Sequence, residues 1–444
     1  MAMPIDQTGA EGISRRELLY LAGTAGLGLG LSGIWGCATD PVTGKSSMAL
    51  YSREKEISLD QKASKVRLSI DYGEVKDETI KKYVSDVGNR IAEASHRPDM
   101  PYRFYVTNSP DINAFTFSGG SIFLSRGILS ELRSEAELAS VIGHEAGHVC
   151  ARHQAEKATM ALITNILLDA AKTAVMIKKA ELGEIMDYFG GVGSMALLTA
   201  YSRENEREAD ALGMEYCSRI KLNPVGMQHV HEMLKRYQEK KGIVVTSALF
   251  QTHPLSDERI QNAKDLLGSK YSACREFPVN EERFMDNTKY LRDTKDVLER
   301  IQWADQAIMD DRLDEANEHY RKALEIEKDS TMILRKMTSL HMIWGNYNKA
   351  YEYAVEARNL NPDDPAVYYA LGEIHMKKGD YGYALKEYER YVKKLPENTA
   401  IYFDVGRCYE KSGHRWKARR AYREYLKDNS FGDRAEYARK YLHS

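Results

Sequence analysis

The sequence predicts a mainly α-helical chain in which an α+β domain with a small sheet precedes an α-solenoid of paired helices. With 444 residues, the chain is too long for one ordinary hydrophobic core. Small residues recur every 34 positions in its C-terminal third, as they do in helical repeats. Strand-like patterns are confined to a short stretch within 102–124, between segments of helical periodicity. We therefore expect two folded domains.

The charge balance indicates which partners to expect. The chain has 63 basic and 65 acidic residues, a formal net charge of −2. A nucleic-acid-binding protein would carry a basic surplus or a patch of basic and aromatic residues, and we find neither in the sequence. We therefore expect no nucleic-acid partner.

The first 37 residues are expected to be an export signal with a lipidation site. Ser14-Arg15-Arg16 precedes an uncharged run, Leu18 to Gly36, and resembles a twin-arginine signal, although an ordinary secretory signal could also carry two arginines. Ile34 to Cys37 resembles a bacterial lipobox, in which Cys37 is lipidated and becomes the mature N-terminus. Trp35 is unusual at its lipobox position. The run is too rich in glycine for an uncleaved membrane anchor, which needs about 20 strongly apolar residues.

The residues after Cys37 indicate the compartment. Ala38 follows the cysteine, and by resemblance to lipoprotein sorting this residue favours the outer membrane. The polar stretch 38–50, with Pro41 and Gly44, is expected to be a tether. We therefore expect a periplasmic protein held by lipid alone at the inner face of the outer membrane.

Five cysteines are present, at positions 37, 150, 217, 274 and 408. Their wide spacing is not that of a disulfide framework, and the absence of C-x-x-C excludes an obvious cysteine metal site. We expect mostly buried thiols, with Cys274 and Cys408 as the pair if a disulfide forms.

Helix and strand signals define the first domain. Tyr102–Val106 and Ser121–Leu124 have strand character and flank turn signals. Ser134 followed by Glu137 predicts a capping box at the start of a helix that continues past position 148. Charged residues interrupt the apolar stretch 158–200, so we expect buried or substrate-facing helices there and not a transmembrane pair.

The last third of the chain repeats with a period of 34 residues. Four alanines fall on this spacing: Ala316, Ala350, Ala384 and Ala418. Two further pairs share it: Gly372 with Gly406, and Tyr368 with Tyr402. Pro362 and Pro396 are placed to end the second helix of their units. This is the tetratricopeptide signature, and it predicts four units from about 298 to 429 and a capping helix from Asp433 to Leu442.

The pentad His144-Glu145-Ala146-Gly147-His148 is the strongest chemical signal in the chain. Two imidazoles four residues apart on a helix project from one face and can share a zinc ion. The carboxylate of Glu145 can then act on the water bound to the metal. This is the H-E-x-x-H pattern of zinc peptidases.

A catalytic zinc needs a third protein ligand and an open position. Glu206 and Asp210 are four residues apart and share a helical face. One of them can bind the metal while the other hydrogen-bonds a ligating histidine from behind. A solvated charged helix would also explain the composition of this segment.

Several segments resemble the family of zinc peptidases that includes HtpX and the CAAX prenyl protease, and within it the periplasmic BepA-like branch with C-terminal tetratricopeptide repeats. The matching segments are Asp111–Phe115 with Gly119-Gly120, His144–Val149 with Arg152-His153, Ser202-Arg203 with Glu206, Ala209 and Asp210, Gln251–Pro254, and Asp40–Gly44. The twin-arginine-like signal and Trp35 depart from the family pattern and concern the export route.

The resemblance implies a zincin-like, gluzincin-type domain with one Zn²⁺ per chain. It assigns His144, His148 and Glu206 to the metal, and Asp210 to the support of a ligand. Glu145 would take a proton from the metal-bound water and return it to the leaving amine, without a covalent intermediate.

Substrate is expected to lie extended along an edge strand at Asn113, Ala114 and Phe115, where it would add its backbone to the sheet. His253 has three possible roles: a transition-state donor, a displaceable fourth zinc ligand that closes the site, or a turn residue before Pro254. His153 is expected to be structural.

The domain boundaries follow: a signal peptide at 1–37, a tether at 38–50, a zinc metallopeptidase domain at 51–270, a linker at 271–297 and the repeat domain at 298–444. The leading hypothesis is a zinc-dependent endopeptidase of the bacterial envelope. It would act on misfolded or stalled envelope and outer-membrane proteins, with the repeats recruiting substrates or protein-assembly partners. The alternative is a chaperone or adaptor lipoprotein in outer-membrane protein assembly, with regulated or minor proteolysis.

Overall fold

The computed structural model divides the chain after Cys37, and the described fold lies in Ala38–Ser444. It describes residues 38–39, 41–44, 46–47, 51–157, 200–239, 249, 252–429 and 432–444. The expected signal segment with Cys37 and the apolar stretch 158–199 lie outside these residues. Two short strands, β1 (Ala38–Thr39) and β2 (Ser46–Ser47), pair antiparallel within the expected tether.

A three-stranded sheet lies in the middle of the first domain. Its strands are β3 (Arg103–Thr107), β4 (Ala114–Thr116) and β5 (Ser121–Ser125), in the order β3-β5-β4. β3 runs parallel to β5, and β4 runs antiparallel to it. The two strands expected from the sequence are therefore confirmed, and β4 is an edge strand.

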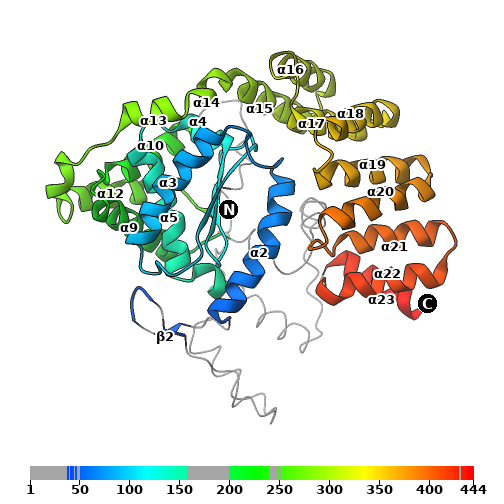
Figure 1. Ribbon diagram of the computed structural model, residues 1–444, viewed down its shortest axis with the longest axis horizontal. Helices are drawn as coiled ribbons and strands as arrows, with labels where there is room; N and C mark the ends of the chain where they lie inside the picture. Colours follow the sequence, from blue (N-terminus) through cyan, green and yellow to red (C-terminus); the bar gives the residue numbers. More distant parts are fainter. Residues whose placement is uncertain are drawn as a thin grey trace, which may run out of the picture. The chain divides into compact units, whose positions relative to one another are not determined.

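Helices that precede and follow the strands in the sequence complete the core of the first domain. α2 (Arg53–Ile70) and α3 (Glu78–Ala94) precede it, and α4 (Arg126–Glu131) and α5 (Glu135–Cys150) follow it. α3 packs on β3, while α5 packs on α3, β4 and β5, as Figure 1 shows. Every residue of α5 is buried, so the predicted metal helix lies in the centre of the domain.

The start of α5 differs from the predicted capping box. The Ser134 hydroxyl accepts a hydrogen bond from the Glu137 amide, as expected. The Glu137 carboxylate, however, accepts from the amide of Arg133 at 2.7 Å and not from Ser134. A complete capping box occurs instead at the next described helix, between Ser202 and Asn205.

α9 (Arg203–Arg219) crosses α5 at very close range, and α10 (Val225–Glu239) packs beside them. Glycines permit this approach. A Cβ atom built on Gly213 would lie 2.9 Å from the His144 amide nitrogen, and one on Gly147 would lie 3.0 Å from the Ala209 carbonyl oxygen. The backbone of α9 therefore lies against the segment of α5 that carries the pentad.

The segment expected to link the domains is helical. After α12 (Asp257–Gly268) come η1 (Ser272–Glu276), α13 (Glu281–Asn287) and α14 (Lys289–Asp293). Phe284 and Leu291 from this segment are buried in the same hydrophobic cluster as the sheet and α5. Apolar side chains at these two positions therefore tie the segment to the first domain.

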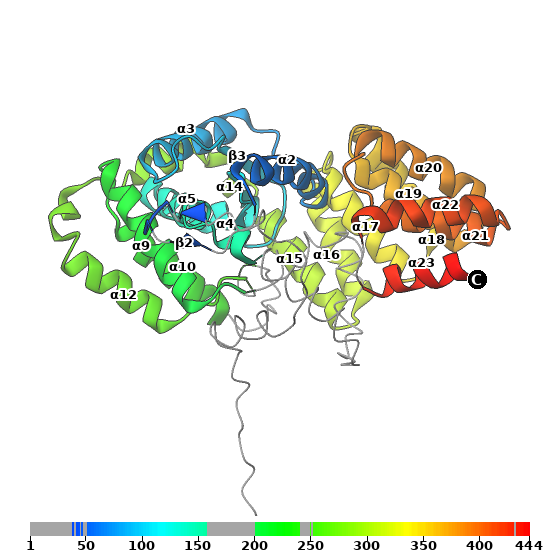
Figure 2. The same cartoon turned by 90° about the horizontal axis from the view of Figure 1, so that it is seen from below.

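Four helix pairs and a final helix form the repeat domain (Figure 2). The pairs are α15 (Lys295–Met309) with α16 (Leu313–Ile326), α17 (Thr331–Ile343) with α18 (Tyr347–Leu360), α19 (Pro365–Lys378) with α20 (Tyr381–Lys394), and α21 (Ile401–Lys411) with α22 (Arg415–Asp428). α23 (Asp433–His443) closes the array. The four periodic alanines are all fully buried, which confirms the predicted register.

Polar contacts join the repeats to the first domain. These contacts include Arg126 with Glu327 at 3.1 Å, Lys295 with Glu131 at 3.1 Å, the Gln302 amide with the Pro110 carbonyl at 2.9 Å, and Lys65 with Glu397 at 2.5 Å. The Arg126 side chain is completely buried. Within the described part of the chain, no helix is long and apolar enough to cross a membrane.

Four cysteines lie in the described residues: Cys150, Cys217, Cys274 and Cys408. All four are buried and free, which confirms the expectation of buried thiols. The conditional pairing of Cys274 with Cys408 is wrong, because the first lies in a cluster with Met214 and Met227 and the second in the core of the repeats.

Candidate metal centre

α5 presents His144, Glu145 and His148 from one buried segment. The two imidazoles lie four residues apart on the helix, and their Nε2 atoms are 3.1 Å from each other. Burial lowers the pKa of His148 well below its usual value, which favours the neutral imidazole that binds metals.

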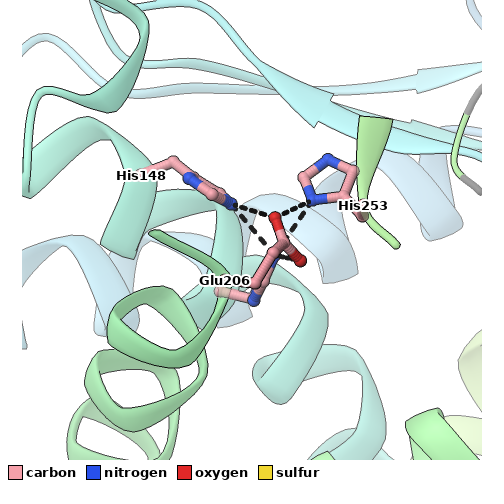
Figure 3. A group of neighbouring side chains, drawn as sticks. His148, Glu206 and His253 are labelled. Carbon is pink, nitrogen blue, oxygen red and sulfur yellow. Dashed lines mark hydrogen bonds and ion pairs between the residues drawn. The ribbon is translucent and has the colours of Figure 1, made fainter. Parts of the chain in front are cut away.

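Two further side chains converge on these histidines. Glu206 from α9 places its carboxylate 3.4 Å from His148 Nε2 and 3.7 Å from His144 Nε2. His253, just before α12, places Nδ1 2.9 Å from Glu206 and 3.2 Å from His144 Nε2. Figure 3 shows the rings of His148 and His253 directed at the Glu206 carboxylate. The structure thus brings together four side chains from three separate segments.

The geometry of these donors fits a metal ion. Their ligand atoms all lie within 4.8 Å of one another, and all four residues are buried. Tetrahedral zinc with bonds of about 2.0–2.1 Å would separate its ligand atoms by about 3.3 Å, close to the spacings above. Two neutral imidazole nitrogens that face each other also gain little without a cation between them. The donor set of three imidazoles and a carboxylate is one that zinc favours.

Glu145 lies beside this cluster without binding to it directly. Its Oε1 is 3.9 Å from His253 Nε2. Its Oε2 is buried and lacks a hydrogen-bond partner among the described residues, as expected for a carboxylate that faces a bound water. Burial raises the pKa of Glu145, which brings this carboxylate closer to the range of an effective general base.

Asp210 supports the ligands from behind. Its Oδ1 accepts a hydrogen bond from His144 Nδ1 at 2.9 Å, which leaves His144 Nε2 free to face the cluster. Arg259 donates to both oxygens of Asp210, at 2.7 and 2.8 Å, and lies 2.5 Å from Glu206. His231 Nε2 lies 3.1 Å from the second Asp210 oxygen. Burial would raise the pKa of Asp210, but Arg259 and His231 hold it well below its usual value.

Sequence reasoning missed two of these supporting residues, Arg259 and His231. The buried bidentate pair of Arg259 with Asp210 connects residues 49 positions apart, so no local sequence pattern predicts it. The sequence reasoning also missed Tyr201, whose ring stacks on His148 with centroids 3.8 Å apart. Tyr201 directly precedes the predicted third-ligand segment, and its aromatic character was the one available signal.

β4 contains Ala114 and Phe115, two of the residues predicted to bind substrate, and Asn113 directly precedes it. Asn113 and Ala114 have buried side chains, while Phe115 is partly exposed. The Asn113 carbonyl accepts from the Ser125 amide, and the Phe117 amide donates to Ser121. Because hydrogen-bonded pairs alternate along an antiparallel ladder, the backbone of Ala114 faces the free edge of the sheet.

Comparisons with known proteins agree with this arrangement. Residues 78–267 match peptidase family M48, and residues 354–394 match a family described as YpiA-like, tetratricopeptide repeats. The first match contains α5 and α9, and therefore the pentad and Glu206. The donor set and the family together imply a metal cofactor.

Three curated relatives illustrate the similarity. The beta-barrel assembly-enhancing protease of Yersinia pestis is 27% identical over 51% of this chain and 46% of its own length. The mitochondrial metalloendopeptidase OMA1 of Schizosaccharomyces pombe is 31% identical over 42% of this chain and 52% of its own length. The metalloprotease LoiP of Escherichia coli is 27% identical over 42% of this chain and 71% of its own length. This chain thus spans about half the length of the first two relatives.

The close-packed crossing of α5 and α9, the converging donors and the sequence match all concern the same part of the chain. Residues 78–267 match peptidase family M48, and the helix pairs that follow include a match to tetratricopeptide repeats.

Proposed function

We propose that this protein is a zinc-dependent endopeptidase of the bacterial cell envelope that hydrolyses misfolded or stalled envelope proteins. The observation that carries the proposal is the buried group His144, His148, Glu206 and His253 beside the Glu145 oxygen that has no hydrogen-bond partner in the described part of the chain. The name of the Yersinia pestis relative, a beta-barrel assembly-enhancing protease, supports outer-membrane proteins as the substrate class.

His144, His148 and Glu206 would hold one zinc ion, which supplies a water of lowered pKa and polarises the scissile carbonyl. Glu145 would serve as the general base, accepting a proton from the attacking water and delivering it to the leaving amine. Asp210 keeps His144 in the tautomer whose Nε2 can bind metal, since the hydrogen bond occupies Nδ1.

His253 is proposed to be a displaceable fourth ligand, so that the structure corresponds to a closed site. The distance of 2.9 Å between its Nδ1 and Glu206 supports this role over that of a turn residue. A His253→Ala variant should then cleave a polypeptide faster than the wild type. Slower cleavage would indicate a transition-state donor, and unchanged cleavage would contradict both roles.

Substrate is proposed to extend β4 by pairing with the backbone of Ala114 at the open edge. Asn113 and Phe115 would position this strand, because Asn113 is buried and Phe115 stacks on Phe123 with centroids 4.7 Å apart. Recognition through the backbone suits unfolded chains of varied sequence.

The repeats are proposed to recruit acidic polypeptide segments, from substrates or assembly partners. α20, α21 and α22 enclose a groove of about 650 Å³. Its apolar lining includes Leu385, Val405 and Trp416, which is 65% exposed. Its charged lining consists of Lys393, Lys417 and Arg420 with Glu389 and Glu424. The three helices as a whole carry twelve basic and six acidic residues.

Charge reversal tests this surface. A Lys417→Glu, Arg420→Glu variant should lose captured envelope proteins while it still cleaves an unfolded model polypeptide at the wild-type rate. Lys322→Glu, on the exposed face of α16, serves as the control. Equal capture by both variants would contradict the assignment of the groove.

The expected lipid attachment at Cys37 and the periplasmic location remain proposals. Labelling with a radioactive fatty acid, compared between the wild type and Cys37→Ala, tests them. Incorporation that does not depend on Cys37 would contradict the lipid anchor.

Substrate trapping tests the function as a whole. Glu145→Gln should retain the metal and its bound polypeptides, which can then be identified. Recovery of no polypeptide would contradict the endopeptidase, and full cellular function of this variant would favour the chaperone or adaptor.

A further inference from the structure

The two histidines of α5 are held from behind in different ways. His144 donates from Nδ1 directly to the Asp210 carboxylate. The Nδ1 of His148 instead lies 2.8 Å from Nδ1 of His153. The Nε2 of His153 in turn lies 3.3 Å from the Glu208 carboxylate. A second imidazole thus stands between His148 and its nearest carboxylate on this side.

We propose that His153 is a positioning residue that, together with Glu208, fixes the tautomer and ring orientation of His148 for metal binding. The inference rests on the proposed metal-dependent function, because it gives His148 the role of a ligand. It assigns a role to a histidine that the sequence indicated only as structural.

The proton arrangement follows from the three contacts. Nε2 of His148 faces the donor cluster and must be unprotonated to bind a metal, so the ring proton resides on Nδ1. Two facing Nδ1 atoms share one proton, and His153 Nδ1 is therefore the acceptor. Its own proton then resides on Nε2, which donates to Glu208. The carboxylate accepts at the end of the chain, and every hydrogen bond has one donor and one acceptor.

The backbone is shaped to bring His153 to this place. A continuous helix would carry a residue five positions after His148 well away from its ring, because each residue turns the helix by about 100°. α5 ends at Cys150, and Arg152 adopts a left-handed conformation with φ of 57°. The buried Glu56 accepts from Arg152 Nε at 3.0 Å and holds this turn. His153 is itself only 3% exposed.

Tyr201 restricts the His148 ring from another direction. Its ring stacks on His148 at an interplanar angle of 22°, while the His153 ring meets His148 edge-on at 69°. The stacked ring limits tilting of the imidazole, and the hydrogen bond to His153 limits its rotation about χ2. Together the two contacts favour the ring orientation in which Nε2 faces Glu206 at 3.4 Å.

The test compares two replacements of His153 in the full chain. Glutamine can accept from His148 through Oε1 and donate to Glu208 through Nε2, whereas leucine can do neither. His153→Leu should weaken zinc binding by about 10–100-fold, the range for loss of such supporting contacts, and His153→Gln should restore most of it. Affinity is measured by competition with a chromophoric chelator. The absorption spectrum of the Co²⁺-substituted protein should change in the leucine variant only.

Glu208→Gln is a second test that remains available if the leucine variant folds poorly. This substitution should weaken zinc binding when it is made in the wild-type chain but not when it is combined with His153→Gln. His229→Leu is the matched control, since His229 pairs with Glu137 at 3.6 Å in the same domain and touches no proposed ligand. Equal zinc affinities of the wild type and the leucine variant, or equal losses in both His153 variants, would overturn the inference. A wild type that binds no zinc would instead refute the proposed function.

Discussion

Replacement of Arg259 by glutamine should destabilise the metal-free protein severely. Arg259 is 6% exposed, contacts both Asp210 oxygens at 2.7 and 2.8 Å, and lies 2.5 Å from Glu206. Its removal leaves two buried carboxylates without their shared cation, and loss of one partner of a buried ion pair costs about 3–5 kcal/mol. Bound zinc would neutralise Glu206, so the loss should be smaller in the zinc-saturated protein.

Urea unfolding with chelator and with excess zinc measures this effect. Arg207→Gln, on the exposed face of α9, is the control, because Arg207 pairs with Glu204 and Glu258 at 3.0 Å and is 44% exposed. Exposed pairs contribute about 0–1 kcal/mol, so this variant should change little. A metal-free Arg259→Gln protein within about 1 kcal/mol of the wild type would refute the argument that this cation holds the site together.

Three further predictions concern packing, pH and metal removal. Gly213→Ala should cost about 1–3 kcal/mol and weaken zinc binding at least about tenfold, because the new Cβ meets the α5 backbone at 2.9 Å. Gly372→Ala, whose new Cβ has atoms of the Tyr388 ring as its nearest neighbours, should destabilise the repeats and leave zinc affinity unchanged. A hydrogen bond to Glu137 raises the pKa of His229, so the contribution of this pair to stability is present below the ordinary histidine pKa and lost as the pH rises through the raised value. The difference in the free energy of unfolding between wild type and His229→Gln should therefore shrink from pH 6 to pH 8. A difference that grows over this range would contradict the pairing. Chelation of the wild type should abolish cleavage reversibly and lower its melting temperature, and an unchanged melting temperature would argue against a metal bound by the folded state.

The helical repeats and the pentad could be predicted from the sequence, because each depends on residues that are close together in the chain. The 34-residue register of Ala316, Ala350, Ala384 and Ala418 depends on one helix pair and its neighbour, so it is visible in sequence. The pentad is equally local, because a single helix places both histidines on one face.

The supports of the site could not be predicted in this way. Arg259 reaches Asp210 from α12 and His231 reaches it from α10, and only tertiary packing brings these helices together. His153 lies near the pentad in sequence, but its contact with His148 depends on the left-handed turn at Arg152, which no residue type there demands. The Glu137 carboxylate accepts from the Arg133 amide and not from Ser134 because the backbone before α5 places the Arg133 amide within reach, and the sequence pattern does not show this backbone path.

Zinc content and cleavage, measured together for the wild type, Glu145→Gln and Glu206→Gln, test the central claim most directly. The donors and the general base have separate roles in the proposed site, so their variants should fail differently. Wild type and Glu145→Gln should each hold one zinc ion per chain, while only the wild type hydrolyses an unfolded polypeptide. Glu206→Gln should lose both zinc and activity. Cleavage by Glu145→Gln at the wild-type rate, or full zinc retention by Glu206→Gln, would contradict the account.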